Sequence, residues 1–544
     1  MDALVRARAD DDAVGLRFED QRWTWREHVQ ASADRAALLE SWRRPGPFHI
    51  GVLLENVPEF SFLLGAAAVS GAVIVGLNPT RRGEELARDV RHADCQFVLA
   101  DERYSDLLEG LDLGVAAGRV IRVDSTEWTD AVAEHAGAPL PGEDVAPDEL
   151  FMLIFTSGTT GAPKAVKCSQ GKIATQGSGV AARFELGAAD TTYLSMPLFH
   201  SNAIIAGWTP TVACGGTIAL ARRFSASGFL PDVRRFGATY ANYVGKPLSY
   251  VLAQPERDDD ASNPLRVVFG NEAAPSDIDR FARRFDVPVF DGFGSTEGGL
   301  SVQRIEGTPP GSLGKPVGDV RIIDPETDEE CPVGEFDEDG RLRNHHEAIG
   351  EMVNFDGSGS FEGYYRNPEE TERRVRGGRY YSGDLAYRDA DGWFYHAGRS
   401  PDWLRVDGEN FAAAPVERIL EQHPEVVLAA VYAVPDVSAG DQVMAALVLR
   451  DSAVLDPEEF VTWLASHRDL SPKWWPRFLR IAEELPQTPT NKVIKRALVA
   501  ERWECDDPVF WREEPDTYRL LTPEDVASLR DRFADNGREH LLVG

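Results

Sequence analysis

The feature that most constrains the fold is a regular alternation of short β-branched segments with longer amphipathic segments. Near the N-terminus, the runs 49–54, 72–77, 96–100 and 119–123 are rich in Val, Ile and Leu, and stretches with helical periodicity such as 84–93 separate them. Strands that alternate with helices form mainly parallel sheets whose faces the helices cover. The sequence therefore predicts an α/β fold, with a large N-terminal domain of α/β subdomains.

The pattern changes toward the C-terminus. From about Val406, a helical segment, two apolar strands, a second helix and a further strand follow one another in a compact α+β order. A chain of 544 residues has room for several domain-sized units. We expect a large N-terminal domain over 1–398, a connecting segment over 399–405 and a small C-terminal domain with a tail extension over 406–544.

The charge balance limits the classes of partner. The chain has 57 basic and 89 acidic residues, a net charge of −32. Such a field repels nucleic acid and anionic membranes, so neither is expected as a partner. None of the five cysteines forms a CxxC pair, which argues against a zinc ribbon or a disulfide scaffold.

One segment reaches membrane-spanning length. Residues 60–77 form an 18-residue run without a charged residue. The run is rich in Ala, Gly and Ser, and the Ser70-Gly71 pair divides it, so we expect a buried helix followed by a buried strand. The N-terminus also lacks the apolar stretch of a signal peptide. The sequence thus predicts a cytoplasmic protein with no integral membrane span.

The strongest local signal follows an apolar run that ends at Phe155. The next nine residues read TSGTTGAPK and include one of only eight lysines in the chain. Glycine lets a backbone approach an anion, while amides, hydroxyls and a lysine supply donors and charge. The spacing is not that of a Walker loop. It predicts a different phosphate-binding loop, with candidates Thr156, Ser157, Gly158, Thr159, Thr160, Gly161 and Lys164.

This loop resembles the [ST]SG[ST]TGxPKG motif of the adenylate-forming superfamily, which includes acyl-CoA synthetases, peptide-synthetase adenylation domains and luciferases. The chain departs from it at Ala165, where the motif has its last glycine. Residues 291–297 look like the YGxTE motif and residues 381–384 like TGD. Residues 398–410 are similar to GRxxDxIKxxGExV, and 486–496 to PxTxxGKxxR. The resemblance covers most of the chain.

The resemblance implies roles for the matched residues. Thr296 would meet the adenylate phosphate, and Glu297 would hold Mg²⁺, which prefers oxygen ligands. Lys492 would be the catalytic lysine of adenylation. Asp384 would accept the ribose hydroxyls, and Arg399 would reach the ribose or a phosphate. A further metal contact is expected at Thr156, and further nucleotide contacts at Gly270, Asn271, Glu272, Asp291, Gly292, Phe293, Gly294 and Ser295.

The implied reaction has two steps, with ATP and Mg²⁺ in the first and CoA as co-substrate in the second. An acid is first adenylated with loss of pyrophosphate, and a thiol then displaces AMP. The resemblance thus implies an N-terminal adenylation domain over 1–398, a hinge over 399–405 and a mobile C-terminal domain over 406–544. This C-terminal domain would rotate about Asp402, withdraw Lys492 and present a thiol channel. The channel candidates are Gly408, Glu409 and Asn410. Lys473 and Trp475 are candidates for the CoA nucleotide, because stacking and a cation suit phosphorylated adenosine.

Within the superfamily, the chain is most similar to the fatty-acid-transport-protein-like branch of actinobacterial long-chain or steroid side-chain acyl-CoA synthetases. His200 is a candidate for the substrate or equally for the core, and Lys246 either pairs a polar substrate group or reaches solvent. Small residues at Ala203, Gly245, Gly298 and Gly299 imply room for a bulky acid. The acyl-substrate candidates are His200, Asn202, Tyr243, Gly245, Lys246 and Gly298.

The favoured function is therefore an ATP-dependent, AMP-forming acid–CoA ligase for a long-chain fatty acid or steroid side-chain acid. The alternative is an adenylating enzyme with a non-CoA acceptor or an unusual acid, such as nitrite for N–N bond formation. Nothing specific supports a luciferase-like oxygenase. A non-catalytic protein and a peptide-synthetase module are disfavoured, the latter because no carrier signature follows Lys492. The expected partners are the acid, ATP and CoA, with a possible homodimer.

Overall fold

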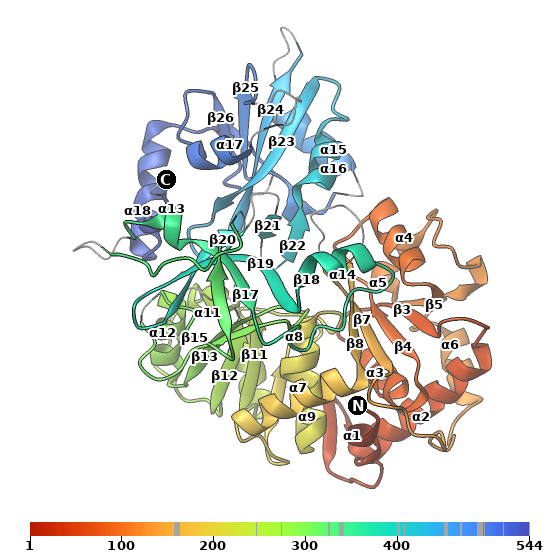
Figure 1. Cartoon of the computed structure of the whole chain (residues 1–544). Coiled ribbons are helices and arrows are strands. Elements are labelled where there is room, and N and C mark those ends of the chain that lie inside the picture. Colours follow the sequence, from red (N-terminus) through yellow and green to blue (C-terminus); the bar gives the residue numbers. More distant parts are fainter. Residues whose placement is uncertain are drawn as a thin grey trace. The chain divides into compact units, whose positions relative to one another are not determined.

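A computed structural model describes the chain (Figure 1) except for residues 157–163, 246, 272, 274, 310, 325–326, 337–341, 400–402, 407–408, 451–454, 468–469, 487–492, 494, 515 and 543–544. The chain divides into two compact units. The first contains Met1–Phe155, Lys164–Arg304 and Asp356–Tyr380, and the second contains most of the rest. The hinge expected at 399–405 falls within the second unit and stays a prediction.

The first unit contains a six-stranded sheet that confirms the four N-terminal strands expected from the sequence. Its neighbours from β6 to β7 pair in parallel. The spatial order is β6 (Val120–Arg122), β5 (Cys95–Ala100), β3 (His49–Leu53), β4 (Val73–Gly76), β7 (Leu150–Thr156) and β8 (Lys164–Ser169). The helices along this part of the chain are α1 (Asp2–Arg6), α2 (Trp25–Trp42), α3 (Pro58–Ser70), α4 (Gly83–His92), α5 (Glu102–Ser105) and α6 (Thr126–Ala133).

The uncharged segment 60–77 folds as the sequence predicts. Helix α3 ends at Gly71, whose φ of 73° is a left-handed conformation that favours glycine, and β4 follows. Both elements are almost wholly buried. Among the described residues, none of the helices has the length and apolar character needed to cross a membrane.

A second, larger sheet of the first unit carries the candidate site. It is parallel except at β14 and β2, which pair antiparallel with their neighbours. The spatial order is β14 (Ser301–Gln303), β13 (Val289–Gly294), β12 (Val267–Asn271), β11 (Tyr240–Val244), β9 (Thr191–Leu194), β10 (Thr217–Leu220), β1 (Val14–Phe18) and β2 (Gln21–Thr24). Its helices are α7 (Gln170–Arg183), α8 (Ser201–Ala203), the π-helical turn η3 (Ile204–Trp208), α9 (Thr209–Cys214), α10 (Phe229–Phe236), α11 (Pro247–Leu252) and α12 (Pro275–Phe285).

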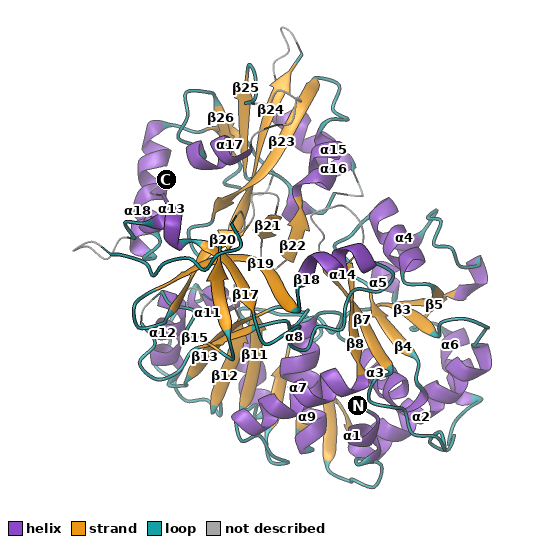
Figure 2. Ribbon diagram, viewed as in Figure 1, coloured by secondary structure: helices purple, strands orange, loops and turns teal. Residues whose placement is uncertain are grey.

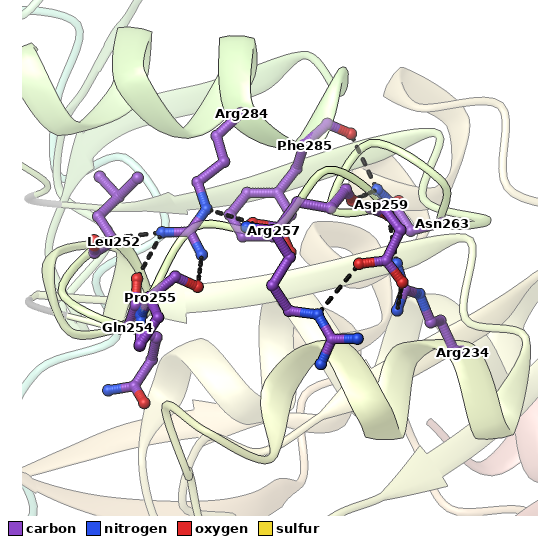
Figure 3. Close-up of polar contacts among 10 residues, drawn as sticks. Arg234, Leu252, Gln254, Pro255, Arg257, Asp259, Asn263, Arg284 and Phe285 are labelled. Carbon is purple, nitrogen blue, oxygen red and sulfur yellow. Dashed lines mark hydrogen bonds and ion pairs between the residues drawn. The ribbon is translucent and has the colours of Figure 1, made fainter.

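Arg284, a largely buried residue near the end of α12, fixes the connection from α11 to β12 (Figure 3). Its Nε donates to Asp260 Oδ2 at 2.6 Å. Its other nitrogens donate to the carbonyls of Leu252, Gln254 and Pro255 at 3.2, 2.9 and 2.9 Å. One side chain thus satisfies the polar groups that the short helix leaves open at its end.

The second unit is α+β, as the sequence predicts for the C-terminal region (Figure 2). A small sheet has the order β16 (Val320–Ile323), β17 (Gly350–Asn354) and β19 (Arg379–Arg388), with β20 (Phe394–Arg399) on β19. The C-terminal sheet has the order β23 (Val426–Pro435), β24 (Asp441–Leu449), β25 (Phe478–Ala482), β26 (Val509–Trp511) and β27 (Arg519–Leu520). The helices α15 (Ala413–Leu420), α16 (Pro457–Ser466), α17 (Lys495–Glu501) and α18 (Pro523–Asp535) accompany it.

Candidate active site

Several of the candidate site residues lie on one face of the neighbouring strands β11, β12 and β13. The strands are in register, so that Asn242 lies beside Phe269, Phe269 beside Phe290, and Asn271 beside Gly292. Because side chains alternate along a strand, these residues share one face. Ligands of open α/β sheets bind outside the carboxyl ends of parallel strands, where Asn271 and Gly292 lie.

A chain of amide hydrogen bonds crosses this face. Asn242 Nδ2 donates to Asn202 Oδ1 at 2.7 Å, and Asn202 Nδ2 donates to Tyr243 O at 3.0 Å and to Asn271 Oδ1 at 3.3 Å. Asn271 Nδ2 donates in turn to Gly292 O at 2.6 Å. The structure thus brings the predicted residues Asn202, Tyr243, Asn271 and Gly292 together and ties α8 to the strand ends.

Thr296 and Glu297, the residues expected to contact the phosphate and Mg²⁺, follow β13 and form hydrogen bonds with three other side chains. Thr296 Oγ1 lies 2.8 Å from Ser201 Oγ. Tyr364 OH donates to Glu297 Oε1 at 2.8 Å. Lys172 Nζ donates to the carbonyls of Thr296 and Glu297 at 3.3 and 3.1 Å. The backbone and the side chains of Thr296 and Glu297 are therefore positioned by contacts within the protein itself.

Charge around Glu297 favours its carboxylate form. Burial alone would raise the pKa of Glu297, but the positive charge of Arg374 and the hydrogen bond from Tyr364 outweigh it, so the pKa lies below its usual value. Lys164 is buried and forms a 2.5 Å ion pair with Glu370, and its Nζ lies 5.8 Å above the Tyr364 ring. Burial lowers the pKa of Lys164. Its expected phosphate contact stays a prediction.

Asp291, a nucleotide candidate, is unusual for a carboxylic acid. It accepts hydrogen bonds from Tyr243 OH at 2.7 Å and from Ala273 N at 3.1 Å. Burial outweighs these bonds and raises its pKa to about 7. Asp291 therefore binds a proton near neutral pH, while burial and the neighbouring Asp291 hold the pKa of the Tyr243 hydroxyl well above its usual value.

The glycines of the site fall into two groups. A Cβ added at Gly298 would lie 2.3 Å from Ser360 Oγ, and one at Gly299 would lie 2.2 Å from the Tyr380 ring. The expectation that these two glycines leave room for a bulky acid is therefore wrong, because neighbouring side chains fill the space. Gly298 also needs its φ of 71°, a conformation that L side chains rarely adopt.

Gly292 and Gly294 are different. A Cβ at Gly294 would meet no atom within 4 Å, and one at Gly292 would meet only atoms at 3.8 Å or more. Neither residue has a positive φ. Neither conformation nor close packing requires glycine at these two positions. Gly294 borders open space on β13, and a side-chain atom at Gly292 would lie at ordinary contact distance from its neighbours.

Several other candidates are described in part. His200 caps α8, and its Nδ1 accepts from Asn202 N at 3.3 Å, so its substrate contact stays a prediction. Gly245, with φ of 74°, donates its N–H to Asn271 O at 2.9 Å. Thr156 is the last residue of β7, Phe293 lies in β13, and Gly270 lies in β12.

The second unit carries the ribose candidate. Asp384 is 3% exposed on β19, and the backbone register places it opposite Arg399 of β20. The neighbouring Gly383 donates its N–H to Glu351 Oε1 at 2.6 Å. Two residues that were expected to meet one ribose thus share one pair of strands.

The CoA-nucleotide candidates do not fit the expected stacking. Trp475 is 8% exposed within a core cluster, and the Arg512 guanidinium lies 5.7 Å from its ring centre. Its ring therefore offers no open face to an adenine, whereas Lys473 is exposed. The expectation that Trp475 stacks on the adenine of CoA is therefore wrong, because the ring belongs to the core.

Many predicted residues lie outside the part of the chain that the structure describes, and their roles stay predictions. They are Ser157, Gly158, Thr159, Thr160, Gly161, Lys246, Glu272, Asp402, Gly408 and Lys492. The side chains of Arg399, Glu409 and Asn410 are likewise outside it.

Sequence reasoning missed four residues of the site. Ser201 lies in the segment that contains His200 but was not selected, and Lys172 was one of only eight lysines. Tyr364 and Glu370 stood in no motif that the sequence singled out. Scarcity of lysine was the one signal that pointed to any of them.

Comparison with known proteins places this geometry in a family context. The model of the AMP-binding enzyme family matches residues 3–365, and the model of the AMP-binding enzyme C-terminal domain matches residues 415–492. The fold is also that of a variant of o-succinylbenzoate CoA synthetase from Bacillus subtilis, with a TM-score of 0.74, 24% identity, and coverage of 92% of this chain and 98% of that one.

Two curated relatives are similar over nearly the whole chain. The medium/long-chain-fatty-acid–CoA ligase FadD17 of Mycobacterium marinum (strain ATCC BAA-535 / M) is 52% identical, over 91% of this chain and 95% of that protein. The steroid-22-oyl-CoA synthetase of Rhodococcus jostii (strain RHA1) is 49% identical, over 98% of this chain and 97% of that protein.

Proposed function

The chain belongs to the AMP-binding enzyme family, and from that premise we propose that it is an ATP-dependent, AMP-forming acyl-CoA ligase. Its acid is a medium- or long-chain fatty acid or a steroid side-chain acid. The observation that carries this is the identity of about half of all residues, over more than nine-tenths of the chain, with ligases of both acid types. Such identity also favours CoA over the other acceptors.

For adenylation, we assign binding of the ATP phosphates to the loop 156–164 and to Lys492. The acid carboxylate and the triphosphate repel each other, so the site must stabilise charge that is brought together in the transition state. Thr296, fixed by Ser201 and by the Lys172 ammonium, would present its hydroxyl to the α-phosphate. Binding both reactants side by side removes much of the entropic cost.

Glu297 fits the part of a Mg²⁺ ligand. Its carboxylate is favoured in the charged form, and only Oε1 accepts the Tyr364 hydrogen bond. Among the described residues, no three His, Cys, Asp or Glu side chains gather as a metal site, so a bound Mg²⁺ would take most of its oxygens from phosphate and water. The ion would supply charge neutralisation at the phosphates.

We place the acid on the open face of β13. Gly294 leaves space there, and the Asn271 side chain, which Asn202 holds, lies beside Gly292 on the same strand pair. The rings of Phe269 and Phe290 extend the same face and would cover an apolar body. The carboxylate would then lie toward Thr296, where the phosphate is expected.

For thioester formation, we assign thiol entry to the segment 408–410 and the turn of the C-terminal domain to Asp402. Lys473 stays a candidate for the CoA phosphates, and we add Arg477, which follows two residues after Trp475. Arg477 is half-buried, and none of the described residues forms a hydrogen bond or ion pair with its guanidinium. Because ATP and CoA are cytoplasmic metabolites, we propose a cytoplasmic location, and a homodimer is to be tested by solution mass.

The test measures acid-dependent ATP–pyrophosphate exchange across fatty, steroid side-chain and aromatic acids and nitrite, with CoA consumption in parallel. Exchange and CoA consumption with a hydrophobic acid are expected. Exchange without CoA consumption would contradict the ligase, and exchange with nitrite alone would support the alternative. A Lys492→Ala variant should lose exchange yet convert a supplied acyl-adenylate to thioester, and full exchange would show that another residue is catalytic.

A further inference from the structure

The lysine that ends the proposed phosphate loop is buried and paired with a carboxylate. Lys164 is 2% exposed, and its Nζ lies 2.5 Å from Oε2 of Glu370, a residue of α14 (Pro368–Arg374). An ammonium that is buried against a carboxylate has its charge neutralised, so that little of this charge acts on a second anion. If Lys164 binds an ATP phosphate, its ion pair with Glu370 must therefore open.

Glu370 has a second cationic partner. Its Oε1 accepts a hydrogen bond from Arg373 Nη1, three residues further along α14. Glu370 is 6% exposed, whereas the side chain of Arg373 is 62% exposed. A buried carboxylate that loses all of its counter-charge is strongly destabilised. Because Arg373 binds the other oxygen, the Glu370 carboxylate stays paired when Lys164 leaves it.

Lys164 also lies close to the residues of the candidate site. Its Nζ is 5.8 Å from the centre of the Tyr364 ring, and the hydroxyl of that ring binds Glu297. Burial lowers the pKa of Lys164, while the negative charges of Glu370 and Glu297 act in the opposite direction. The ammonium therefore interacts both with Glu370 and with the proposed metal ligand, beside which the phosphates are expected.

The backbone on both sides of this ion pair is held by hydrogen bonds. Residues 165–167 of β8 form backbone hydrogen bonds with the segment 363–365, which leads into α14. Asn367 caps α14, since its Oδ1 accepts from Glu370 N at 3.2 Å. Lysine, in contrast, carries its charge on a flexible four-carbon chain with rotatable donors. A change of partner by Lys164 therefore needs only rotation about its side-chain bonds.

We propose that Glu370 is a positioning residue that holds the Lys164 ammonium until ATP binds. The ammonium then moves from Glu370 to a phosphate oxygen, while Arg373 keeps the Glu370 carboxylate paired. This inference rests on the proposed function, because it requires the triphosphate of ATP to lie at the loop 156–164. Opening the ion pair takes free energy, so Glu370 stabilises the empty site and weakens the binding of ATP.

A static ion pair makes different predictions. Lys164 and Glu370 would then join β8 to α14 in the empty and in the occupied site alike. Loss of Glu370 would leave a buried ammonium unpaired and disturb the loop, so that ATP would bind as before or more weakly. Removal of the exposed Arg373 would not change the affinity for ATP. The two alternatives therefore differ in the sign of the change in ATP affinity.

The experiment measures the Kd of ATP with Mg²⁺ by titration calorimetry and the KM of ATP and of the acid in pyrophosphate exchange. Glu370→Gln should lower the Kd and KM of ATP about tenfold, the value of a hydrogen bond to a charged group, and leave the KM of the acid unchanged. Lys164→Met should raise the Kd of ATP. In the double variant, Glu370→Gln should no longer lower this Kd, because the carboxylate acts through Lys164. An equal or higher Kd in Glu370→Gln, or an equal lowering with and without Lys164, would overturn the inference.

Arg373→Met is the second variant, and it decides the question if Glu370→Gln does not fold. Without Arg373, the departure of Lys164 leaves the buried Glu370 carboxylate without either cation, so the Kd of ATP should rise about tenfold. The control is Arg366→Met, which removes one positive charge from the same segment, but Arg366 pairs with Asp94. This control should keep the wild-type Kd. An unchanged Kd in Arg373→Met would overturn the inference. Failure of the proposed function would instead appear as ATP binding without exchange for any acid.

Discussion

The hydroxyl of Tyr364 donates a 2.8 Å hydrogen bond to Glu297 Oε1, joining residues 67 positions apart in the chain. The same tyrosine ring lies under the Lys164 ammonium at 5.8 Å. Tyr364 therefore contacts both the proposed metal ligand and the lysine of the phosphate loop. Its hydroxyl keeps one oxygen of the Glu297 carboxylate in place.

Tyr364→Phe removes this hydrogen bond and keeps the ring. Because the bond stabilises the charged form, its loss raises the pKa of Glu297. The carboxylate is then lost at a less acidic pH, so the acid limb of the pH profile moves to higher pH. We expect about a tenfold fall in kcat/KM for exchange, as for one hydrogen bond to a charged group. The readout is the pH dependence of exchange.

The matched control is Tyr365→Phe. Tyr365 is the next residue, and its hydroxyl donates to Asp94 Oδ2 at 2.9 Å rather than to Glu297. Its removal should leave the pH profile in place. Identical profiles for the two variants would show that the Tyr364 bond does not tune Glu297.

Lys172→Met tests whether the backbone of the proposed phosphate and metal residues needs its ammonium. Lys172 Nζ donates to the carbonyls of Lys167, Thr296 and Glu297. We expect unfolding to become easier by about 1–3 kcal/mol, because buried acceptors lose their donor. Exchange should fall more than the conversion of supplied acyl-adenylate to thioester, measured side by side.

Lys167→Met removes the same charge from the neighbouring strand and serves as the control. Its side chain is only half-buried, and the Lys172 ammonium contacts its carbonyl rather than its amine. The variant should keep both half-reactions. Parallel losses of both half-reactions in Lys172→Met would reduce its role to folding.

The fold could be predicted because its signals are local. Runs such as 49–54 and 72–77 are continuous and β-branched, as strands buried on both faces must be, and β3 and β4 are wholly buried. The split of 60–77 was visible because Gly71 follows Ser70, and a glycine at that place ends a helix.

The site was predictable only where a motif carried it. A motif identified Thr296 and Glu297. The residues that bind them do not belong to that motif, because Tyr364 lies 67 positions from Glu297 and Lys172 lies more than 120 positions from Thr296. Such contacts depend on tertiary packing and leave no local pattern. Glycines show the same limit, since Gly294 faces open space and Gly299 faces the Tyr380 ring.

Asp291→Asn tests whether the Asp291 carboxyl, which accepts a hydrogen bond from Tyr243, binds a proton in the folded chain. The folded-state pKa of about 7 lies above the usual value of 3.8, so the native chain binds a proton that the unfolded chain releases. Stability therefore falls as pH rises between these values. The asparagine variant lacks this pH-dependent loss of stability. Its melting temperature should therefore rise relative to that of the wild type as the pH increases from about 4 to about 7.

Asp190→Asn is the control, because the stability contributed by the Asp190 carboxylate depends on pH with the opposite sign. Burial would raise the pKa of Asp190, but hydrogen bonds from Thr239 and Gly187 N outweigh it and lower the pKa. Removing that carboxylate should cost stability at neutral pH and less in acid. If the Asp291 variant behaved in the same way, Asp291 would be charged in the folded chain.

Arg284→Met tests the clamp at the end of α11 (Figure 3). The substitution leaves the buried Asp260 carboxylate without its ion-pair partner and frees the carbonyls of Leu252, Gln254 and Pro255. Breaking one side of a buried pair typically costs about 3–5 kcal/mol, so we expect a loss of that size in the urea unfolding transition that includes the first unit.

Arg257→Met is the control for the clamp, because Arg257 is mostly exposed and pairs with the exposed Asp259 at 3.1 Å. An exposed pair contributes about 0–1 kcal/mol, so this variant should unfold almost as the wild type does. The double variant Arg284→Met with Asp260→Leu removes both charges and should recover part of the loss, since no unpaired charge stays buried. A double variant no more stable than Arg284→Met would mean that the freed carbonyls, rather than the Asp260 charge, account for the loss.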